Sequence, residues 1–345
     1  MSKSNWRSFK ASLEHKDKVY ILKGRIHLRR GIFPGEVEVM TINDIPTNQV
    51  LPGMPEIPYT TTLSHPFILP AKSIAASFTL KMDGTAILFS ALSLPDGEVA
   101  VFPRTRGMVI IQDTKWRPLR TLVERALGDE LRQRLAAVCR QQNATLVFEL
   151  WGADNQHTVQ YDTPLRLSLH TMIKGRNALQ PWRLVKQVAK AYSIPTVKEL
   201  VRVVPSQLSE DALLQISQKL VTEQEKQNNP QMGLYRHEGV VLNVETQSRG
   251  LQWKFKPRSM EEYHRLARVK ILPITVFHLL WKLVDQGEEV SLAVLLEAMT
   301  KEYGKEAVSQ QQAAIAHHYW FWLSKYYDLT AAHQEEQILS GVASV

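Results

Sequence analysis

The hydrophobic periodicity of the sequence changes once, at Pro257, and this change divides the chain into two parts. Before Pro257, short apolar runs are separated by Pro, Gly, Asp and Asn, a pattern typical of strands joined by turns. After it, apolar residues recur only at helical spacing, as in 276–283. We therefore expect an α+β domain over residues 1–258, with a strand-rich N-terminal extension over 1–70, and a small all-α domain over 259–345.

Helices are expected to interrupt the strand-like part at three places. The spacing of Leu and Val predicts a helix over 118–141, and 182–194 and 208–226 also have helical patterns. The apolar run 107–111 is assigned to a strand, and strands return at 237–244 before the helical part begins.

Composition excludes several classes of protein. The single Cys139 rules out an intramolecular disulfide and any all-cysteine metal site, and we expect it to be a buried apolar residue on a helix. No run approaches the roughly 18 apolar residues of a spanning helix, and the first ten residues lack the apolar core of a signal peptide, so a cytoplasmic protein without membrane contact is expected. We also expect a monomer. The net charge of +8 favours a polyanionic partner.

Four short segments place charged residues among strand residues. Side chains two apart in a strand share a face, so KMDG (81–84) presents Lys81 and Asp83 together, and WKFKP (253–257) presents Lys254 and Lys256 together. Two ammonium groups on one face repel each other unless an anion lies between them.

The other two segments place acids in apolar surroundings. Glu149 lies in FELWG (148–152), and Glu238 in EGVVL (238–242) is an expensive core position for an unpaired carboxylate. Taken singly, each of the four segments also has an ordinary structural interpretation, because an exposed Lys-x-Lys protects an edge strand and a Glu on an edge strand can face solvent.

Together and in this order, the four segments resemble the motifs of the covalent nucleotidyltransferase superfamily, which contains ATP-dependent RNA ligases, DNA ligases and mRNA capping enzymes. The resemblance covers about residues 80–257. It implies a nucleotidyltransferase domain with ATP-grasp-like antiparallel sheets and flanking helices. A helical tail is similar to that of RNA ligases, whereas a strand-rich barrel would follow the last motif in the other two groups.

The resemblance implies a role for each motif residue. Lys81 carries the nucleotidyl group, Asp83 assists the lysine or a metal, and Glu238 is linked to the metal. The residues that contact the nucleotide are Lys81, Arg104 or the better-spaced Arg106, Glu149, Lys254 and Lys256. In the stretch that resembles the adenine-stacking motif, His170 replaces the usual Phe or Tyr, and Leu80 stands where many RNA ligases have Glu.

The implied activity is ATP-dependent RNA ligation with Mg²⁺ or Mn²⁺. Lys81 attacks the α-phosphate to form lysyl-AMP, and the adenylate passes to an RNA 5′-phosphate, which an RNA 3′-hydroxyl then attacks. A lysine nucleophile must be neutral, and we expect Lys254, Lys256 and a metal to lower the pKa of Lys81. A GTP-dependent capping-type guanylyltransferase and a catalytically inactive RNA-binding relative remain alternatives.

Two segments outside the motifs are further candidates for RNA contact. Residues 101–140 hold nine Lys or Arg against four acids, an excess that could follow an RNA backbone or form a solvated helix face. The aromatic run 317–327 could stack on unpaired bases or form core. The sequence leaves the type of RNA open.

Overall fold

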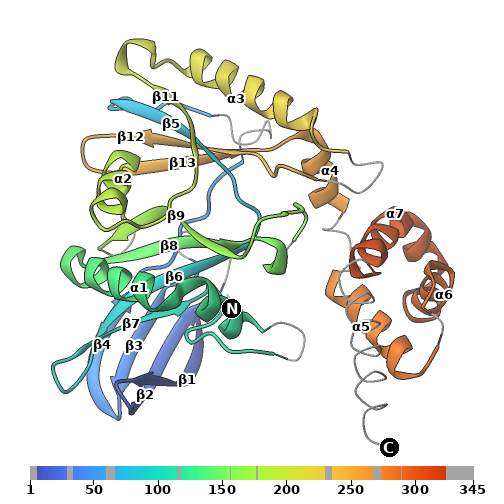
Figure 1. Ribbon diagram of the computed structural model, residues 1–345, viewed down its shortest axis with the longest axis horizontal. Coiled ribbons are helices and arrows are strands. Elements are labelled where there is room, and N and C mark those ends of the chain that lie inside the picture. Colours follow the sequence, from blue (N-terminus) through green and yellow to red (C-terminus); the bar gives the residue numbers. More distant parts are fainter. Residues whose placement is uncertain are drawn as a thin grey trace, which may run out of the picture. The chain divides into compact units, whose positions relative to one another are not determined.

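The computed structural model describes residues 6–28, 34–59, 67–114, 118–155, 157–175, 178–229, 235–266, 273–288 and 290–323. The chain divides into two compact units, Met1–Pro257 and Arg258–Val345. All described strands belong to the first unit, and they pair antiparallel in three sheets (Figure 1). The predicted α+β composition with antiparallel sheets and helices is therefore confirmed.

Figure 1 shows one sheet between the other two. The N-terminal sheet has the order β1-β2-β3-β4, the central sheet β10-β9-β8-β6-β7 and the outer sheet β11-β5-β12-β13. The strands of the N-terminal sheet are β1 (Trp6–His15), β2 (Lys18–His27), β3 (Val37–Ile42) and β4 (Ile45–Leu51). Those of the central sheet are β6 (Thr85–Ser93), β7 (Val99–Arg104), β8 (Ala144–Trp151), β9 (Arg166–Lys174) and β10 (Ala178–Leu179). Those of the outer sheet are β5 (Ala75–Leu80), β11 (Glu199–Val203), β12 (Val240–Glu245) and β13 (Gly250–Phe255).

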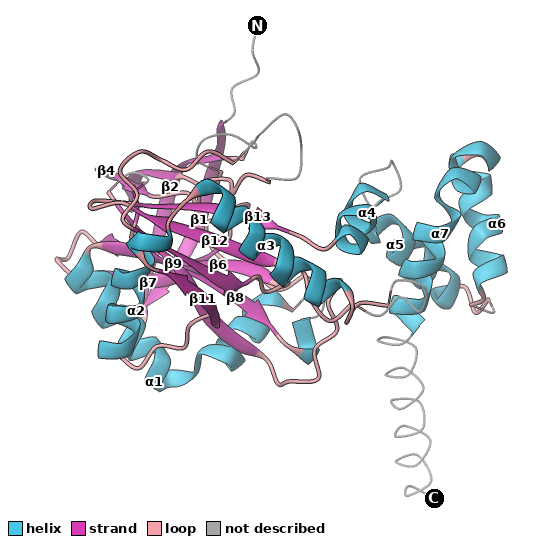
Figure 2. Ribbon diagram, turned by 90° about the horizontal axis from the view of Figure 1, so that it is seen from above, coloured by secondary structure: helices cyan, strands magenta, loops and turns pink. Residues whose placement is uncertain are grey.

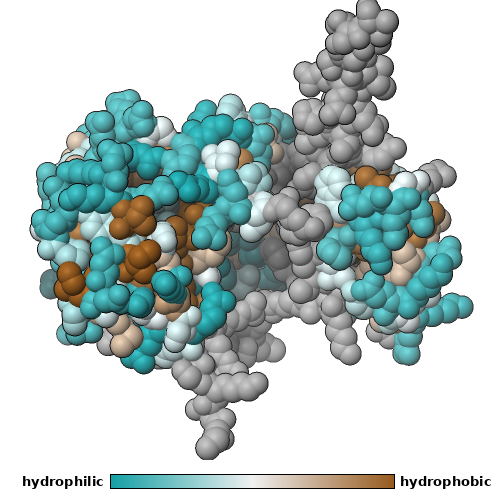
Figure 3. All heavy atoms as spheres, turned by 90° about the horizontal axis from the view of Figure 1, so that it is seen from below, coloured by the Kyte–Doolittle hydropathy of each residue, from teal (hydrophilic) through white to brown (hydrophobic). Residues whose placement is uncertain are grey.

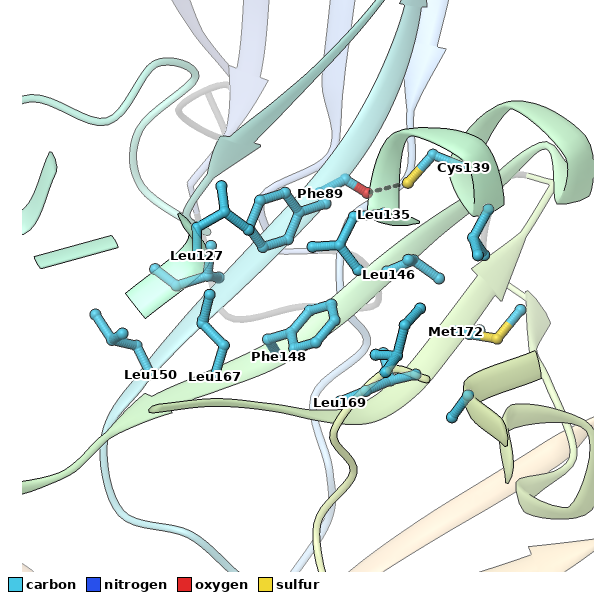
Figure 4. Close-up of a cluster of buried hydrophobic side chains, with 14 of the residues drawn as sticks. Phe89, Leu127, Leu135, Cys139, Leu146, Phe148, Leu150, Leu167, Leu169 and Met172 are labelled. Atoms are coloured by element: carbon cyan, nitrogen blue, oxygen red, sulfur yellow. Dashed lines mark hydrogen bonds between the residues drawn. The ribbon is translucent and has the colours of Figure 1, made fainter. Parts of the chain in front are cut away.

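Helices α1 (Leu119–Gln142) and α2 (Trp182–Ala191) pack on the central sheet through one large apolar core. Figure 4 shows side chains of α1 meeting those of β6, β8 and β9 in this core, where the Cys139 thiol contacts the carbonyl oxygen of Phe89 at 3.6 Å. Cys139 is fully buried, and burial raises the pKa of its thiol to about 12. Its predicted place as a buried helix residue is confirmed. Gly128, with φ 56° and ψ 170°, interrupts α1 with a kink between two helical parts.

Helix α3 (Glu210–Glu225) covers the outer sheet, as Figure 2 shows from above. It begins where Ser209 caps it, since the Ser209 hydroxyl accepts a hydrogen bond from the Ala212 N–H at 3.2 Å. Leu213, Ile216 and Leu220 then recur at helical spacing and pack on the apolar face of the sheet. The opposite face of the outer sheet is left for polar residues.

Two strand assignments from the sequence need correction. Residues 107–111 form no strand, although Val109 and Ile111 are buried, because they belong to a loop that fills core space between the sheets. The predicted strand over 237–244 begins only at Val240, so its acidic residue precedes the strand.

The second unit contains four helices among its described residues: α4 (Arg258–Leu266), α5 (Pro273–Asp285), α6 (Leu292–Tyr303) and α7 (Lys305–Trp322). Its core includes Val276, Leu280, Leu295, Met299 and Trp322, each with no exposed surface. No helix in the described part of the chain is both long and apolar enough to cross a membrane.

On the face of the first unit that Figure 3 shows, apolar side chains gather among mainly polar ones. Exposed apolar residues of the N-terminal sheet are Val19, Met40, Ile45 and Val50. The inner face of the same sheet packs on β6 and β7 through a separate apolar core. The N-terminal sheet therefore has one face packed on the rest of the unit and one face toward solvent.

Candidate active site

The motif KMDG forms the connection from β5 of the outer sheet to β6 of the central sheet. The N–H of Lys81 donates to the carbonyl oxygen of Gly239 at 3.0 Å, and the N–H of Asp83 donates to the hydroxyl of Tyr161 at 2.8 Å. A Cβ on Gly84 would lie 2.1 Å from the carbonyl oxygen of Leu150, so only glycine fits where the chain enters the central sheet. Lys81 is thus held at the junction of two sheets.

Glu238 lies between two lysines from different motifs. One of its carboxylate oxygens accepts a hydrogen bond from Lys81, and the other accepts one from Lys256 at 2.5 Å. The side chain of Lys81 is 20% exposed, while those of Glu238 and Lys256 are 6% and 3% exposed. The carboxylate of Glu238 is therefore paired on both sides, in a Lys-Glu-Lys bridge, and its burial does not leave an unpaired charge.

Glu238 reaches this position because glycine follows it. Gly239 has φ +138°, and a Cβ there would lie 2.1 Å from the carbonyl oxygen of Phe255. The backbone before β12 can therefore approach the end of β13 closely, which brings Glu238 beside Lys256.

The charges of this bridge oppose the expected neutral state of Lys81. Burial acts to lower the pKa of Lys81, but the carboxylates of Glu238 and Glu149 outweigh burial and raise it above the ordinary value. Burial acts to raise the pKa of Glu238, but Lys81 and Lys256 bring it down to about 2. The prediction that neighbouring cations neutralise Lys81 is wrong for the free protein, because an acid lies between those cations.

Lys254 is the amine whose pKa is lowered. Burial, and then the positive charges of Lys81 and Lys256, reduce the pKa of Lys254 to about 7. Its ammonium nitrogen lies 3.8 Å from the centre of the Tyr59 ring, and that of Lys256 lies 5.5 Å from the same ring. The N–H of Lys254 also donates to the carbonyl oxygen of Pro58 at 3.0 Å, which fixes the ring beside the lysines.

The sequence does not predict that Tyr59 belongs to this site. It belongs to no charged motif, and it precedes KMDG by more than twenty residues in a proline-rich stretch. Only the pairing of its backbone alongside β13 brings the ring to the lysines.

Glu149 on β8 and His170 on β9 face each other at 4.0 Å, measured from Oε2 to Nε2. Burial, then repulsion from Glu238 and Asp83, raises the pKa of Glu149 to about 8. Burial, then the charges of Lys81 and Arg106, lowers the pKa of His170 to about 3, so its ring is neutral. The buried Nε2 of His170 has no hydrogen-bond partner among the described residues. The gap between the two groups therefore offers hydrogen-bonding atoms to a ligand.

Asp83 anchors a loop. Its Oδ2 accepts hydrogen bonds from the N–H groups of Thr158 at 2.7 Å and Val159 at 2.8 Å. Burial, then repulsion from Glu238, raises the pKa of Asp83 to about 6. The loop therefore uses one oxygen of Asp83, whereas both oxygens of Glu238 accept hydrogen bonds from lysines.

The two candidate arginines, Arg104 and Arg106, have different surroundings. Arg104 has no exposed surface, and its guanidinium donates to Ser90 Oγ at 3.0 Å and to the carbonyl oxygens of Gly35 at 2.6 Å and Pro52. It ties the N-terminal sheet region to β7, so its predicted nucleotide contact needs correction. Arg106 instead acts electrostatically on Glu149 and His170, which places its charge at the site.

Many of the basic residues in 101–140 form ion pairs with acidic residues. Lys115 and Arg117 lie outside the described residues. Ion pairs link four arginines of α1 to acids, namely Arg120 to Glu14, Arg125 to Asp154, Arg132 to Glu124 and Arg134 to Glu130. These contacts favour a solvated helix face over an RNA track.

The aromatic run 317–327 is described only as far as residue 323. Within it, Trp322 and Tyr319 are buried in the core of the second unit, whereas Trp320 is 57% exposed. Most of the described run is therefore core.

Similarity to known proteins agrees with this geometry. The chain matches the model of a family described as RNA ligase over residues 64–264, more than half of its length. No curated protein sequence matches it. Among solved structures, it is similar to an archaeal ATP-dependent RNA ligase, with TM-score 0.51 and 16% identity over 92% of this chain and 76% of that chain. A putative ATP-dependent DNA ligase from Aquifex aeolicus is similar with TM-score 0.53 and 14% identity, over 93% and 78% of the two chains.

Proposed function

Because the chain belongs to the RNA ligase family, we propose that it uses ATP to join RNA 5′-phosphate and 3′-hydroxyl ends, with Lys81 as the nucleophile. The observation that carries this proposal is the bridge in which Glu238 holds Lys81 and Lys256 together in a buried site. The similarity to an ATP-dependent RNA ligase and to a putative ATP-dependent DNA ligase supports ATP as the nucleotide.

The reaction has three steps. Lys81 Nζ attacks the α-phosphorus of ATP, a P–N bond forms, and the P–O bond to pyrophosphate breaks. An oxygen of the RNA 5′-phosphate then attacks the same phosphorus, which breaks the P–N bond and returns the lysine. Finally an RNA 3′-hydroxyl attacks the activated 5′-phosphate, the new phosphodiester forms, and AMP leaves.

The residues around Lys81 have distinct parts in this scheme. Lys254 and Lys256 neutralise the triphosphate, with the Tyr59 ring positioning both ammonium groups. Glu149 and His170 receive the ribose and base in the gap between the Glu149 carboxyl group and the unpartnered Nε2 of His170. Glu238 keeps Lys81 protonated until nucleotide binding changes its partners. Once the negative charge of Glu238 is offset, burial becomes the main influence on Lys81 and favours the neutral amine.

A divalent cation fits the charge balance of the site. Glu238, Glu149 and Asp83 are three carboxyl groups of one site, and the pKa values of Glu149 and Asp83 are raised by burial first and then by repulsion from Glu238. Among the described residues no three His, Cys, Asp or Glu side chains form a metal-binding group, so phosphate oxygens would complete the coordination around Glu238 and Asp83. Mg²⁺ or Mn²⁺ bound there supplies positive charge that stabilises the reacting phosphates.

The second unit is proposed as an all-helical domain that selects the RNA. It presents the exposed Trp320, and an exposed aromatic ring can stack on an unpaired base. In the full chain, Trp320→Ala should weaken RNA sealing and leave lysyl-AMP formation unchanged.

The test of the main proposal is covalent labelling. Incubation with α-labelled ATP and Mg²⁺ should label the protein, and α-labelled GTP should not. Lys81→Met should abolish the label, while Lys219→Met, which changes an exposed lysine of α3, should retain it. Label that persists on the Lys81 variant would refute the assignment, and label from GTP alone would favour the guanylyltransferase alternative.

A further inference from the structure

A pocket of about 510 Å³ lies in the first unit, outside the lysine site. It is lined by residues 55–58, by Ala178 and Leu179 of β10, and by residues 249–253 around β13. None of Lys81, Glu149 and Glu238 lines it. The pocket lies at the free edge of the outer sheet, because β13 is the last strand in the order of that sheet.

The edge of β13 is open over a short length. The N–H of Lys254 points outward to the carbonyl oxygen of Pro58 at 3.0 Å, and antiparallel pairing alternates, so the N–H and C=O of Gln252 point outward as well. At the other end, Gly250 lies so close to Gln180 that a Cβ would be 2.6 Å from its carbonyl oxygen. The open stretch is too short to pair with an added strand, but its length suits the edge of one planar group.

The side chains in the pocket combine apolar walls with a few polar groups. Gln252 is 9% exposed, and its Nε2 donates to Asn243 Oδ1 at 2.8 Å. Its buried Oε1 has no partner among the residues that the structure describes. A buried acceptor without a donor is costly, so a ligand that donates a hydrogen bond there gains affinity.

Aromatic and cationic groups complete the pocket. Trp253 lines it and meets Phe67 edge-on, with ring centres 5.1 Å apart. Arg249 is exposed and forms no ion pair within the described part of the chain. Glu56 is the one acid among the lining residues. The Trp253 side chain lies on the face of β13 opposite to Gln252, because neighbouring residues of a strand point to opposite faces. An unpaired arginine and an unsatisfied amide oxygen are groups that recognise the phosphate and the amino edge of a nucleotide.

We propose that this pocket binds one unpaired nucleotide of the RNA strand, with an amino group of the base on Gln252 Oε1 and a phosphate on Arg249. The inference rests on the proposed function and extends it. Gln252 and Lys254 are two residues apart on β13, a distance of about 7 Å. A single RNA strand can therefore occupy the pocket and reach the lysine site. ATP is not the occupant, because its binding groups, Glu149 and His170, lie on the central sheet and do not line the pocket.

RNA binding by the full-length protein tests the proposal. The probe is a fluorescent single-stranded RNA ten-mer with a 5′-phosphate and a blocked 3′ end, and its Kd is measured by anisotropy without ATP. Arg249→Glu removes the phosphate contact, and Ala178→Trp fills the pocket from an exposed position of β10. Each variant should raise the Kd about tenfold, as expected for a lost base or phosphate contact. The control is Arg202→Glu, which makes the same charge change at an exposed position on β11, the opposite edge of the sheet.

Two results would overturn the proposal. One is a Kd for RNA that is the same in both pocket variants as in the Arg202 variant. The other is a raised KM for ATP in lysyl-AMP formation with RNA binding unchanged, which would make the pocket part of the ATP site. Because the Kd is measured without ATP, failure of the wild-type protein to form lysyl-AMP would refute the proposed function and leave the pocket separately tested.

Discussion

Replacing Glu149 by Gln should stabilise the free protein at alkaline pH while impairing its use of ATP. Burial and neighbouring acids raise the pKa of this carboxyl group from 4.5 to about 8. Below pH 4.5 the group is neutral in both the folded and unfolded states. As the pH rises toward 8, the unfolded chain ionises Glu149 while the folded protein keeps it protonated, so the folded state loses stability.

The size of this loss follows from the two pKa values. A difference of about 3.5 pH units at 1.36 kcal/mol each corresponds to about 5 kcal/mol, lost between pH 4.5 and 8. The side chain of Glu149 is only 16% exposed, so solvent screens little of it. Gln has a similar shape and no charge at any pH. The free energy of unfolding of the Gln variant minus that of wild type should therefore rise from near zero at pH 4.5 to several kcal/mol at pH 9.

The single Cys139 provides a specific assay. It is buried in the first unit, so its reaction with a thiol reagent after equilibration in urea reports the unfolding of that unit alone. The midpoint is compared at pH 5, 7 and 9 for wild type, Glu149→Gln and a control, Glu130→Gln, whose carboxylate is 86% exposed. A wild-type-minus-variant difference that does not change with pH would refute the reasoning.

Three further changes should have distinct effects. Tyr59→Leu removes the ring beside Lys254 and should slow lysyl-AMP formation about tenfold, whereas Tyr59→Phe should retain the rate; equal rates for the two variants would contradict a role for the ring. Asp83→Ala should increase amide hydrogen exchange at Val159 by more than tenfold, because the N–H loses its carboxylate acceptor, and unchanged protection would argue against loop anchoring. Arg104→Met should lower the free energy of unfolding of the first unit by about 3 kcal/mol or more with the KM for ATP unchanged, and a raised KM with normal stability would return this arginine to the nucleotide site.

The motif residues were predictable because their charges break an apolar pattern. Lys81, Glu149, Glu238 and Lys256 each stand in a strand-like segment where a charge is costly, and the structure brings Lys81, Glu238 and Lys256 together. Which of these residues pair with each other was less predictable. The alternation of side chains along a strand placed Lys254 and Lys256 on one face, but only the three-dimensional structure puts Glu238 between Lys256 and Lys81. Because the acid lies between the two lysines, the pKa of Lys81 shifts in the direction opposite to the expected one.

Contacts between segments far apart in the chain could not be predicted from the sequence. Tyr59 reaches the site through a backbone pairing with Lys254, and Arg104 is withdrawn from it by carbonyl oxygens of a loop and a strand end far away in the chain. The loop over 107–111 was mistaken for a strand because buried apolar residues have the same composition in either conformation.

The route of the chain through KMDG restricts how this protein can be re-engineered. Leu80 is tied to Lys198, Lys81 to Gly239 and Asp83 to Tyr161, each by its own backbone N–H, and Gly84 abuts Leu150. Inserting or deleting one residue there would shift the register of two sheets at once. New chain termini, tags or split points therefore belong in hairpin turns, where a change of length alters neither sheet.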